Sequence, residues 1–595
     1  MLDLVDHGDG ALLGVERSLL GQSWSTRPVE LHVVEAIAQR TGLPEIIARV
    51  IAARGVALDD VEEFLDPSLR NSLPDPSVLK DMDVAVERLA HAVMAGESIT
   101  VFGDYDVDGA TSSGVFIQYL RAIGADASAY IPDRLKEGYG PNGPALEKLA
   151  AAGTRLVVTV DCGIQSYDAL EAGAAAGLDV LVVDHHKAEP ELPKAVAVVN
   201  PNRLDDESDL GHLAAVGVTY LLIVALNRQL RVKGYFQSRR AEPNLLQFLD
   251  MVALGTVCDV VPLKGLNRVF VRQGLKVMAQ RRNIGLTALM DVAGLDARPD
   301  AYHLGFMLGP RINAGGRVGE SDSGTRLLTM KDTAQASELA QHLDVLNKER
   351  QAIEMAVLDA AIAQVGNPGD VPVIIVYDEG WHPGVVGIVA SRLKDRFQRP
   401  AVVIGMENGT GKGSGRSING VDLGAVIIAA RQQGLLLNGG GHAMAAGLTV
   451  GAEKIDALCE FLITQLAAPV ARARAAQGLK LDGVLSLSGV TPELVSQLEQ
   501  AGPFGVGNPT PRFAVPDCTI VSADIVGKDH VRLILAQGQG ARVKAMAFRQ
   551  GETQFGQNLL NSVGRKFHVA GRLKRDDWGA KPKAELHLDD ASPII

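Results

Sequence analysis

A chain of 595 residues is long enough for several domains with cores of ample size. Only four cysteines occur, which argues against a disulfide framework and for a reducing compartment, and no Cys-x-x-Cys pair supports a thiolate zinc site. The net charge of −12 does not by itself indicate nucleic-acid binding, although a local basic surface would still attract phosphate.

The first ten residues, MLDLVDHGDG, are acidic and lack the apolar core of a signal sequence. The longest apolar stretch, near residues 213–226, is interrupted by Gly217, Thr219 and Tyr220 and is shorter than a bilayer span. We therefore expect a buried helix there, no membrane contact, and a cytoplasmic protein.

Residues 1–95 are predicted to be helical, with an amphipathic pattern through residues 43–51. From residue 98 to about 199, apolar runs alternate with helical patterns, which is typical of βαβ units and a parallel sheet. An α/β lobe is therefore expected in this part of the chain.

Three of these apolar runs end in metal-binding residue types: Asp104, Asp106 and Asp108 after the first, Asp161 after the second, and Asp184, His185 and His186 after the third. Open α/β sheets bind ligands at the carboxyl ends of their strands, so we expect one site. Carboxylates this close resist joint ionisation unless a divalent cation neutralises them. A single Asp after a strand is more often a helix cap or turn former, but three strands with matching ends favour a metal site.

The mixture of ligands narrows the choice of metal. Oxygen donors alone suit magnesium or calcium, whereas added imidazole favours manganese, iron or zinc. We expect manganese, with magnesium as a substitute. Five or more ligands exceed the needs of one ion, so the pattern predicts two ions that support in-line attack at phosphorus.

An apolar helix over residues 245–258 is predicted to deliver Asp259 after a turn. Taken alone, Asp259 is better explained as a loop acid. Cys162 and Cys258 adjoin proposed ligands, but a lone buried cysteine usually behaves as a small hydrophobic residue, so both stay outside the predicted site.

Three glycine-rich segments carry basic and polar residues, and we expect them to be loops that bind the substrate. Backbone amides in such loops approach an anion closely, and arginine offers bidentate contacts to phosphate. The alternative is turn glycines with surface arginines. The role of His382 has two alternatives: it contacts phosphate, or it caps the following helix. The predicted substrate-binding residues are Arg311, Asn313, Arg317, His382, Ser414, Arg416 and His442.

Residues 332–365 contain no proline or glycine and have apolar residues at helical spacing, which predicts a long helix connecting two lobes. A second α/β lobe is expected from residue 373 to about 466, followed by a helical linker over 470–477. The predicted domain limits are 1–95, 96–330, 331–368, 369–466 and 479–595.

After Leu479 the pattern changes to short alternating runs at 519–521, 531–535, 542–546 and 567–572, which favours a small barrel of OB type. Residues 565–583 hold seven Lys/Arg against two Asp, with Phe567 and Trp578 among them. Such a pattern suits a groove for single strands. A solvated β-face with one core aromatic explains it equally well.

GDYDVDG (residues 103–109), the lone Asp161, the DHH triplet and GTVCDVVPL (residues 255–263) resemble the four signature motifs of the DHH phosphoesterase superfamily. RINAGGR (311–317), GSGRS (413–417) and GGGHAMAAG (439–447) resemble the RecJ branch and its DHH-associated domain. The similarity runs in the family's order from about residue 25 to the C-terminus. It implies two α/β lobes joined by a long helix, plus a C-terminal OB-type barrel.

The resemblance also implies a site. Because Asp259 matches the fourth motif, the resemblance favours a metal ligand over a loop acid at this position. The expected metal ligands are Asp106, Asp108, Asp161, His185 and Asp259. Asp104 and His186 are additional ligands or partners of ligands.

The activity that the resemblance implies is hydrolysis of single-stranded DNA from the 5′ end to nucleoside 5′-monophosphates, in DNA repair and recombination. A monomer in the bacterial cytosol, associated with the nucleoid, is expected, with a RecQ-type helicase and single-strand-binding protein as partners. Two alternatives stay open. A DHH-family oligonucleotide phosphodiesterase would generally lack the C-terminal barrel, and a non-catalytic replication scaffold would lose ligands that are all present here.

Overall fold

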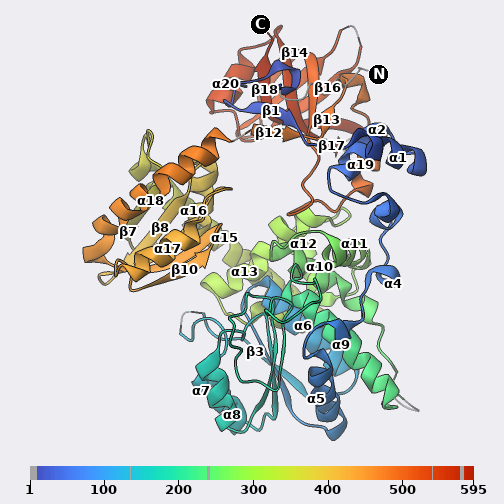
Figure 1. Ribbon diagram of the computed structural model, residues 1–595, viewed down its shortest axis with the longest axis vertical. Helices are drawn as coiled ribbons and strands as arrows, with labels where there is room; N and C mark the ends of the chain where they lie inside the picture. The colour runs from blue at the N-terminus through green and yellow to red at the C-terminus, as the bar shows by residue number, and fades with distance from the viewer. Residues whose placement is uncertain are drawn as a thin grey trace. The chain divides into compact units, whose positions relative to one another are not determined.

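The computed structural model describes residues 10–134, 136–236, 241–476, 478–538, 540–576 and 582–594. Internal contacts divide the chain into two compact units, and many of their elements are labelled in Figure 1. One unit contains residues 75–259 and 274–476. The other contains the described residues up to 74, residues 260–273, and those after 477.

The first α/β lobe is built on a five-stranded parallel sheet in the order β3-β2-β4-β5-β6. Its central strands are buried on both faces, which explains their continuous apolar sequence. The strands are β2 (Ile99–Gly103), β3 (Ala127–Tyr130), β4 (Leu156–Val160), β5 (Asp179–Val183) and β6 (Ala197–Val199).

Helices surround this sheet, and α6, α9 and α10 pack against one another. The predicted buried helix is α9. It is long and apolar enough to span a membrane, but 72% of its apolar window is buried inside the protein, as in the core helix of a globular lobe. The helices are η3 (Pro76–Val78), α5 (Met82–Ala95), α6 (Val107–Ala122), α7 (Gly143–Ala151), α8 (Tyr167–Ala175), α9 (Ala215–Val232), η4 (Leu245–Phe248), α10 (Leu249–Cys258), α12 (Ile284–Val292), η5 (His303–Leu308), α13 (Gly309–Val318) and α14 (Ser323–Thr329).

The predicted long helix is confirmed as α15 (Thr333–Val365). Asp332 caps its first turn by accepting a hydrogen bond from the Gln335 amide, and Gly366, with a φ of 55°, ends it.

The second α/β lobe follows α15 and contains a mixed sheet in the order β10-β11-β9-β8-β7. Only the β7–β8 pair is parallel within this sheet. Its elements are β7 (Ile374–Glu379), α16 (Pro383–Phe397), β8 (Ala401–Glu407), β9 (Thr410–Arg416), α17 (Leu423–Gln432), β10 (Asn438–His442), β11 (Ala445–Gly451), η6 (Ala452–Lys454) and α18 (Ile455–Ala475). The predicted linker over 470–477 is the end of α18 as far as Ala475.

The prediction of a loop around Arg311, Asn313 and Arg317 is wrong, because all three lie in α13. The glycines there serve close packing: a Cβ at Gly316 would lie 3.0 Å from the Tyr105 carbonyl oxygen. Glycine in a helix permits such an approach at a modest cost in helix propensity.

The two other predicted loops are strands. Ser414 and Arg416 lie in β9, and His442 ends β10. The alternate glycines of β9 face neighbouring side chains, and a Cβ at Gly415 would lie 2.6 Å from Leu423. The glycine pattern here marks a tightly packed strand, not a turn.

The C-terminal part forms a closed five-stranded barrel in the order β14-β15-β16-β18-β17, closed by the β14–β17 pairing. The β16–β18 pair is parallel, and a helix joins β16 to β17. The predicted OB-type barrel is therefore confirmed. The elements of this C-terminal part, including those outside the barrel, are β12 (Gly478–Leu481), β13 (Gly483–Val484), η7 (Leu487–Gly489), α19 (Pro492–Gln500), β14 (Phe513–Val526), β15 (His530–Ala536), β16 (Arg542–Ala547), α20 (Gln554–Leu560), β17 (Lys566–Asp576) and β18 (Lys583–Pro593). Trp578 lies outside the described residues.

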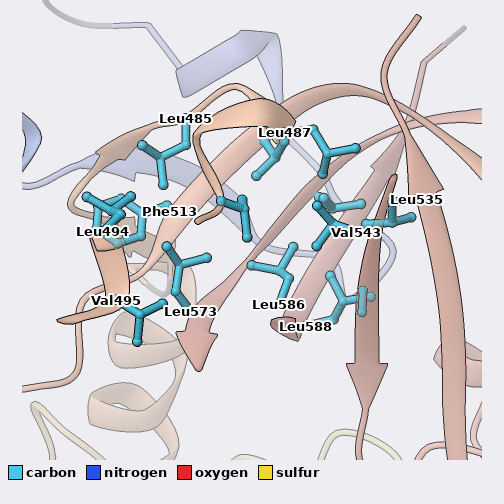
Figure 2. Packing of buried hydrophobic residues seen from close by; sticks show 14 of the residues in the cluster. Leu485, Leu487, Leu494, Val495, Phe513, Leu535, Val543, Leu573, Leu586 and Leu588 are labelled. Carbon is cyan, nitrogen blue, oxygen red and sulfur yellow. The ribbon is translucent and has the colours of Figure 1, made fainter. Parts of the chain in front are cut away.

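The N-terminal helices share a core with this barrel. Val34, Ile47 and Ile51 join Phe513 and Leu586 in one buried cluster, whose barrel side is shown in Figure 2. The N-terminal segment is not wholly helical, since β1 pairs in parallel with β12. Its elements are η1 (Leu12–Gly14), β1 (Ser23–Thr26), α1 (Leu31–Thr41), α2 (Glu45–Ala52), η2 (Leu58–Asp60), α3 (Val61–Leu65) and α4 (Leu69–Ser72), and α11 (Gly265–Met278) begins within residues 260–273.

Candidate metal centre

The carboxyl ends of β2, β4 and β5 meet at one edge of the parallel sheet, as open α/β sheets require of a ligand site. A further acid, Asp259, lies at the C-terminal end of α10. The seven predicted catalytic residues lie together at this edge: Asp104, Asp106, Asp108, Asp161, His185, His186 and Asp259.

His185 is at the centre of the cluster. Its Nε2 lies 3.4 Å from Asp161 Oδ1, 3.6 Å from Asp259 Oδ2 and 4.0 Å from Asp108 Oδ2. Its Nδ1 lies 3.0 Å from the Leu213 carbonyl oxygen, which can only accept, so Nδ1 donates. Nε2 of the neutral ring therefore presents a lone pair to three carboxylates.

Asp184 orients the histidines. Its Oδ1 accepts hydrogen bonds from the backbone amides of His185 and His186 and from His186 Nδ1 at 2.7 Å. Burial opposes ionisation of Asp184, but these hydrogen bonds and the nearby imidazoles hold its pKa below the usual value. Burial likewise opposes the charge on His186, yet the bond to Asp184 raises the pKa of His186.

Backbone amides position the acids of α6. Asp106 caps this helix, with Oδ1 accepting hydrogen bonds from the Asp108 and Gly109 amides. The alternative role considered for an Asp after a strand, that of a helix cap, therefore applies to Asp106 as well. The carboxylate of Asp108 accepts from the Ala215 and Val216 amides at the start of α9. The positive end of that helix favours negative charge at this position.

Asp161 has a φ of 61°, in the left-handed region that non-glycine residues seldom occupy. Tyr139 donates its hydroxyl to the Asp161 carbonyl at 2.9 Å and so helps to hold this conformation. Backbone strain of this kind is concentrated at functional sites.

The unbound cluster is electrostatically unfavourable. Burial first, and then the charge of Asp106, raises the pKa of Asp104 to about 8 and that of Asp108 to about 7. Burial and the surrounding carboxylates also raise the pKa of Asp161 and of Asp259. Burial lowers the pKa of His185. Protons or divalent cations must therefore neutralise the acids.

The donor atoms fit divalent cations. In the described part of the chain, four buried atoms of this site make no hydrogen bond: Asp104 Oδ1, Asp161 Oδ1, His185 Nε2 and Asp259 Oδ2. Buried polar atoms without a protein partner are costly unless an ion or water satisfies them. Candidate ligand atoms fall into three groups, each within 4.8 Å: Asp108, His185 and Asp259; Asp161, His185 and His186; and Asp104, Asp106 and Asp161.

Two partly buried arginines, Arg134 and Arg317, interact with these acids. Burial, with the nearby charges of Arg134 and Arg350, lowers the pKa of Arg317 to about 10, while Asp106 opposes the shift. Arg317 donates to the Gly384 carbonyl at 2.9 Å, and the Arg134 guanidinium lies over the Tyr105 ring. Burial also lowers the pKa of Arg416, which donates to Ser414 Oγ at 2.9 Å. We call Arg134, Arg317 and Arg416 the arginine cluster.

The order of the three parts of the chain matches known sequence families. The DHH family, N-terminal domain, matches residues 98–256, the DHHA1 domain residues 370–468, and the RecJ OB domain residues 481–590. The single-stranded-DNA-specific exonuclease RecJ of Salmonella typhimurium is 36% identical over 572 residues, covering 93% of this chain and 96% of that protein. The protein of the same name from Bacillus subtilis is 33% identical, covering 96% of this chain and 70% of its own length.

The chain belongs to the RecJ family. Its structure is similar to RecJ in complex with Mn²⁺ from Thermus thermophilus, with a TM-score of 0.80 and 28% identity over 96% of this chain and 79% of that one. The Mg²⁺ complex of the same protein gives a TM-score of 0.73 and 27% identity over 96% and 78%. These are the two ions that the sequence predicted.

The RecJ-family fold separates the predicted substrate-binding residues. Arg311 pairs with Asp344 at 2.9 Å, so its charge is already compensated within the lobe. His382 caps α16 by accepting from the Gly384 amide, which is one of the two predicted alternatives. Arg317, Ser414 and Arg416 come together beside α16, where a Cβ at Gly387 would lie 3.0 Å from Ser414 Oγ and 3.1 Å from Arg416 Nη2. Asn313 lies in α13, and His442 is exposed at the end of β10.

Sequence reasoning missed two parts of this RecJ-family site. Asp184 belongs to the recognised DHH triplet, and its position directly after a buried strand was a usable signal. Arg134 stands in no motif, and only the folded chain brings it near Arg317.

Proposed function

We propose that this protein is a metal-dependent exonuclease that hydrolyses single-stranded DNA from the 5′ end to nucleoside 5′-monophosphates. The observation that carries the proposal is the unpartnered lone pair of His185 facing the buried carboxylates of Asp108 and Asp161 and the partly buried carboxylate of Asp259, with the partly buried Arg317 nearby. Acids that attract cations and arginines that attract phosphate form the two halves of a phosphodiester site.

Asp106, Asp108, Asp161, His185 and Asp259 are the proposed metal ligands, with Mn²⁺ or Mg²⁺ as the ion and two ions per site. Divalent ions in such a centre would lower the pKa of water, so that hydroxide is available to attack phosphorus at neutral pH, and would neutralise charge on the phosphate. Asp104 lies beside Asp106 and Asp161, and its buried Oδ1 is available as a further ligand or as an acceptor for a water proton.

His186 is proposed to act on the substrate. Its bond to Asp184 holds the ring and favours the charged form, while its Nε2 makes no hydrogen bond to a described residue. That nitrogen can donate to a phosphate oxygen or to the departing 3′ oxygen.

The arginine cluster and Ser414 are proposed to hold the phosphate of the 5′ end. A desolvated guanidinium binds an anion more strongly than an exposed one, because less water competes. Asn313 and His442 are proposed as further DNA contacts, His382 as a contact that also caps α16, and Arg311 as a residue that positions α13 through Asp344.

Other proposals follow the family. We propose a monomer in the bacterial cytosol, associated with the nucleoid and active in DNA repair and recombination, with a RecQ-type helicase and single-strand-binding protein as partners. The domain limits stated above are proposed as functional divisions, with residues 479–595 binding DNA.

One assay tests the central proposal. Purified full-length protein is given 5′- or 3′-labelled single strands and matched duplexes, with Mn²⁺, with Mg²⁺, or after exhaustive chelation. We expect mononucleotides to be released from the 5′ end of single strands only when either ion is present. Full activity in the chelator, or equal degradation of duplex, would contradict the proposal.

A further inference from the structure

Two exposed aromatic side chains belong to the π-helical turn η5: Tyr302 lies immediately before it and Phe306 lies within it. Tyr302 is 59% exposed and Phe306 is 72% exposed. Their ring centroids lie 5.1 Å apart with an interplanar angle of 24°, so the rings are stacked. Single exposed hydrophobic residues are common, but two stacked rings present a flat apolar surface to solvent.

The turn has a buried side and an exposed side. Leu304 and Leu308 are fully buried, and Gly305 lies against Val257 of α10. The two aromatics therefore project outward because the chain between them is anchored inward. A π-helical turn is rare and occurs often at functional sites.

The same turn is fixed to the metal centre. Cys258, the last residue of α10, donates its thiol to the Leu304 carbonyl at 3.4 Å, and a Cβ at Gly309 would lie 2.4 Å from Cys258 Sγ. Cys258 immediately precedes Asp259. The helix that continues from η5 is α13, which carries Arg317 of the arginine cluster.

We propose that Tyr302 and Phe306 form a shelf on which a nucleobase of the single strand stacks while a nearby phosphodiester occupies the metal centre. The inference rests on the proposed function and adds a binding site to it. Every base has a π-face, so stacking on aromatic side chains tolerates any sequence. The cations that Asp259 would help to hold, and Arg317 in the helix that follows η5, are proposed to meet the phosphate backbone of the same strand.

The shelf also contributes to strand selectivity. Bases within a duplex are already stacked on their neighbours, so they must be unstacked before a ring can reach them. A single strand presents its bases at little cost. Residues 302 and 306 therefore favour single strands without reading their sequence.

A substitution series separates stacking from simple apolar contact. Phe306→Leu keeps an apolar side chain without a ring, Phe306→Trp keeps a ring, and Tyr302→Ala shortens the shelf. Met355→Ala is the matched control, because Met355 is 60% exposed on α15. All four changes are at exposed positions, and thermal unfolding checks that each variant is folded.

The first measurement is equilibrium binding of full-length protein to short single strands in EDTA, with one abasic site moved along the strand. We expect wild type to lose about tenfold in affinity at one abasic position, as a lost stack predicts. Phe306→Leu should bind intact DNA about tenfold more weakly and lose nothing further at that position. Phe306→Trp and Met355→Ala should resemble wild type.

The second measurement is turnover with Mn²⁺. Phe306→Leu should raise KM about tenfold and leave kcat within about twofold. In a separate fluorescence measurement, 2-aminopurine at the sensitive position should be quenched by wild type but not by the variant. The same abasic penalty in wild type and Phe306→Leu would overturn the inference, as would a change of oligomeric state in Phe306→Leu, which marks a protein interface. Loss of the proposed function is recognised separately, since wild type would then bind DNA without hydrolysing it.

Discussion

At the scale of single residues, the centre is a set of acids that the fold holds together against their mutual repulsion. Asp161 illustrates this best, because it is buried, lies 3.4 Å from His185, and has a left-handed backbone. Replacing Asp161 is expected to lower nuclease activity and to raise the stability of the metal-free protein.

Asp161→Asn should lose about a thousandfold in nuclease turnover, since loss of metal activation commonly costs several kcal/mol. Asparagine tolerates the left-handed conformation, so the backbone should persist. The variant should melt at a higher temperature than wild type in EDTA at pH 8, because one repelling charge is gone. Near-normal turnover in the folded variant would show that Asp161 is not a ligand.

Asp250 predicts a pH dependence unrelated to the metal centre. It is 2% exposed, and burial raises its pKa to about 7 against the opposing hydrogen bond from the Met251 amide. An unfolded aspartate has a pKa of about 3.9. The folded state therefore holds this proton more tightly, and stability contributed by Asp250 falls as the pH rises from about 4 to 7.

Asp250→Asn should accordingly raise the melting temperature at pH 8 and have little effect at pH 4. The shift corresponds to at most about 4 kcal/mol at 1.36 kcal/mol per pKa unit. Thermal unfolding of both proteins across this range gives the measurement. Equal pH profiles for the two proteins would contradict the assignment.

At the scale of elements, a buried ion pair within α15 is extended to α16 by a half-exposed arginine. Arg350 donates to Glu354 at 2.6 Å, with both side chains 9% exposed, and the half-exposed Arg392 of α16 reaches the other oxygen of Glu354 at 3.1 Å. Glu354→Ala leaves the buried Arg350 without a carboxylate partner, although its hydrogen bonds to Asn347 Oδ1 remain, and this should destabilise the unit by about 3 kcal/mol. Adding Arg350→Met should restore most of this loss, and Arg392→Ala alone should cost under about 1 kcal/mol. Chemical denaturation of wild type and these three variants measures the differences in the free energy of unfolding.

Strand β9 provides a test of substrate positioning. Arg416→Ala should lower kcat even at saturating DNA, because the partly buried guanidinium is proposed to hold the 5′ phosphate in place. Lys412→Ala is the matched control, since Lys412 is exposed on the same strand and at the same strand parity as Ser414 and Arg416. If Arg416→Ala changed KM alone, Arg416 would contribute binding without positioning.

At the scale of the whole molecule, the division of the chain does not follow its sequence order. The N-terminal helices α1 and α2 share a buried core with the C-terminal barrel, from which more than 400 residues separate them in sequence. Ile47, Val50 and Ile51 are fully buried there. Removing the barrel would expose them.

A chain ending at Ala476 should therefore bind a hydrophobic dye and aggregate, because each exposed aliphatic side chain forfeits about 1.5–3 kcal/mol of burial. We expect the full-length protein to do neither. If the shortened chain instead stayed monomeric, with a raised KM and unchanged kcat, residues after 476 would contribute DNA binding alone.

The sequence by itself determined which residues form the candidate metal centre and in what order the parts follow one another. Acids at the ends of three apolar runs must meet when those runs form one parallel sheet, because strand direction places their carboxyl ends at one edge. The helical spacing of residues 332–365 and the alternation after Leu479 were equally local signals, and both elements formed as predicted.

Only the tertiary structure decided what the glycines do and which arginines are buried. A glycine pattern is equally compatible with a turn and with close packing. Gly316 lies in a helix against Tyr105, and Gly415 lies in a strand against Leu423, so both serve close packing. Arg311 and Arg317 are similar in sequence context, yet Asp344 pairs with the first, while the second lies partly buried near Asp106. Burial and pairing depend on residues far away in the chain, and no local pattern encodes them.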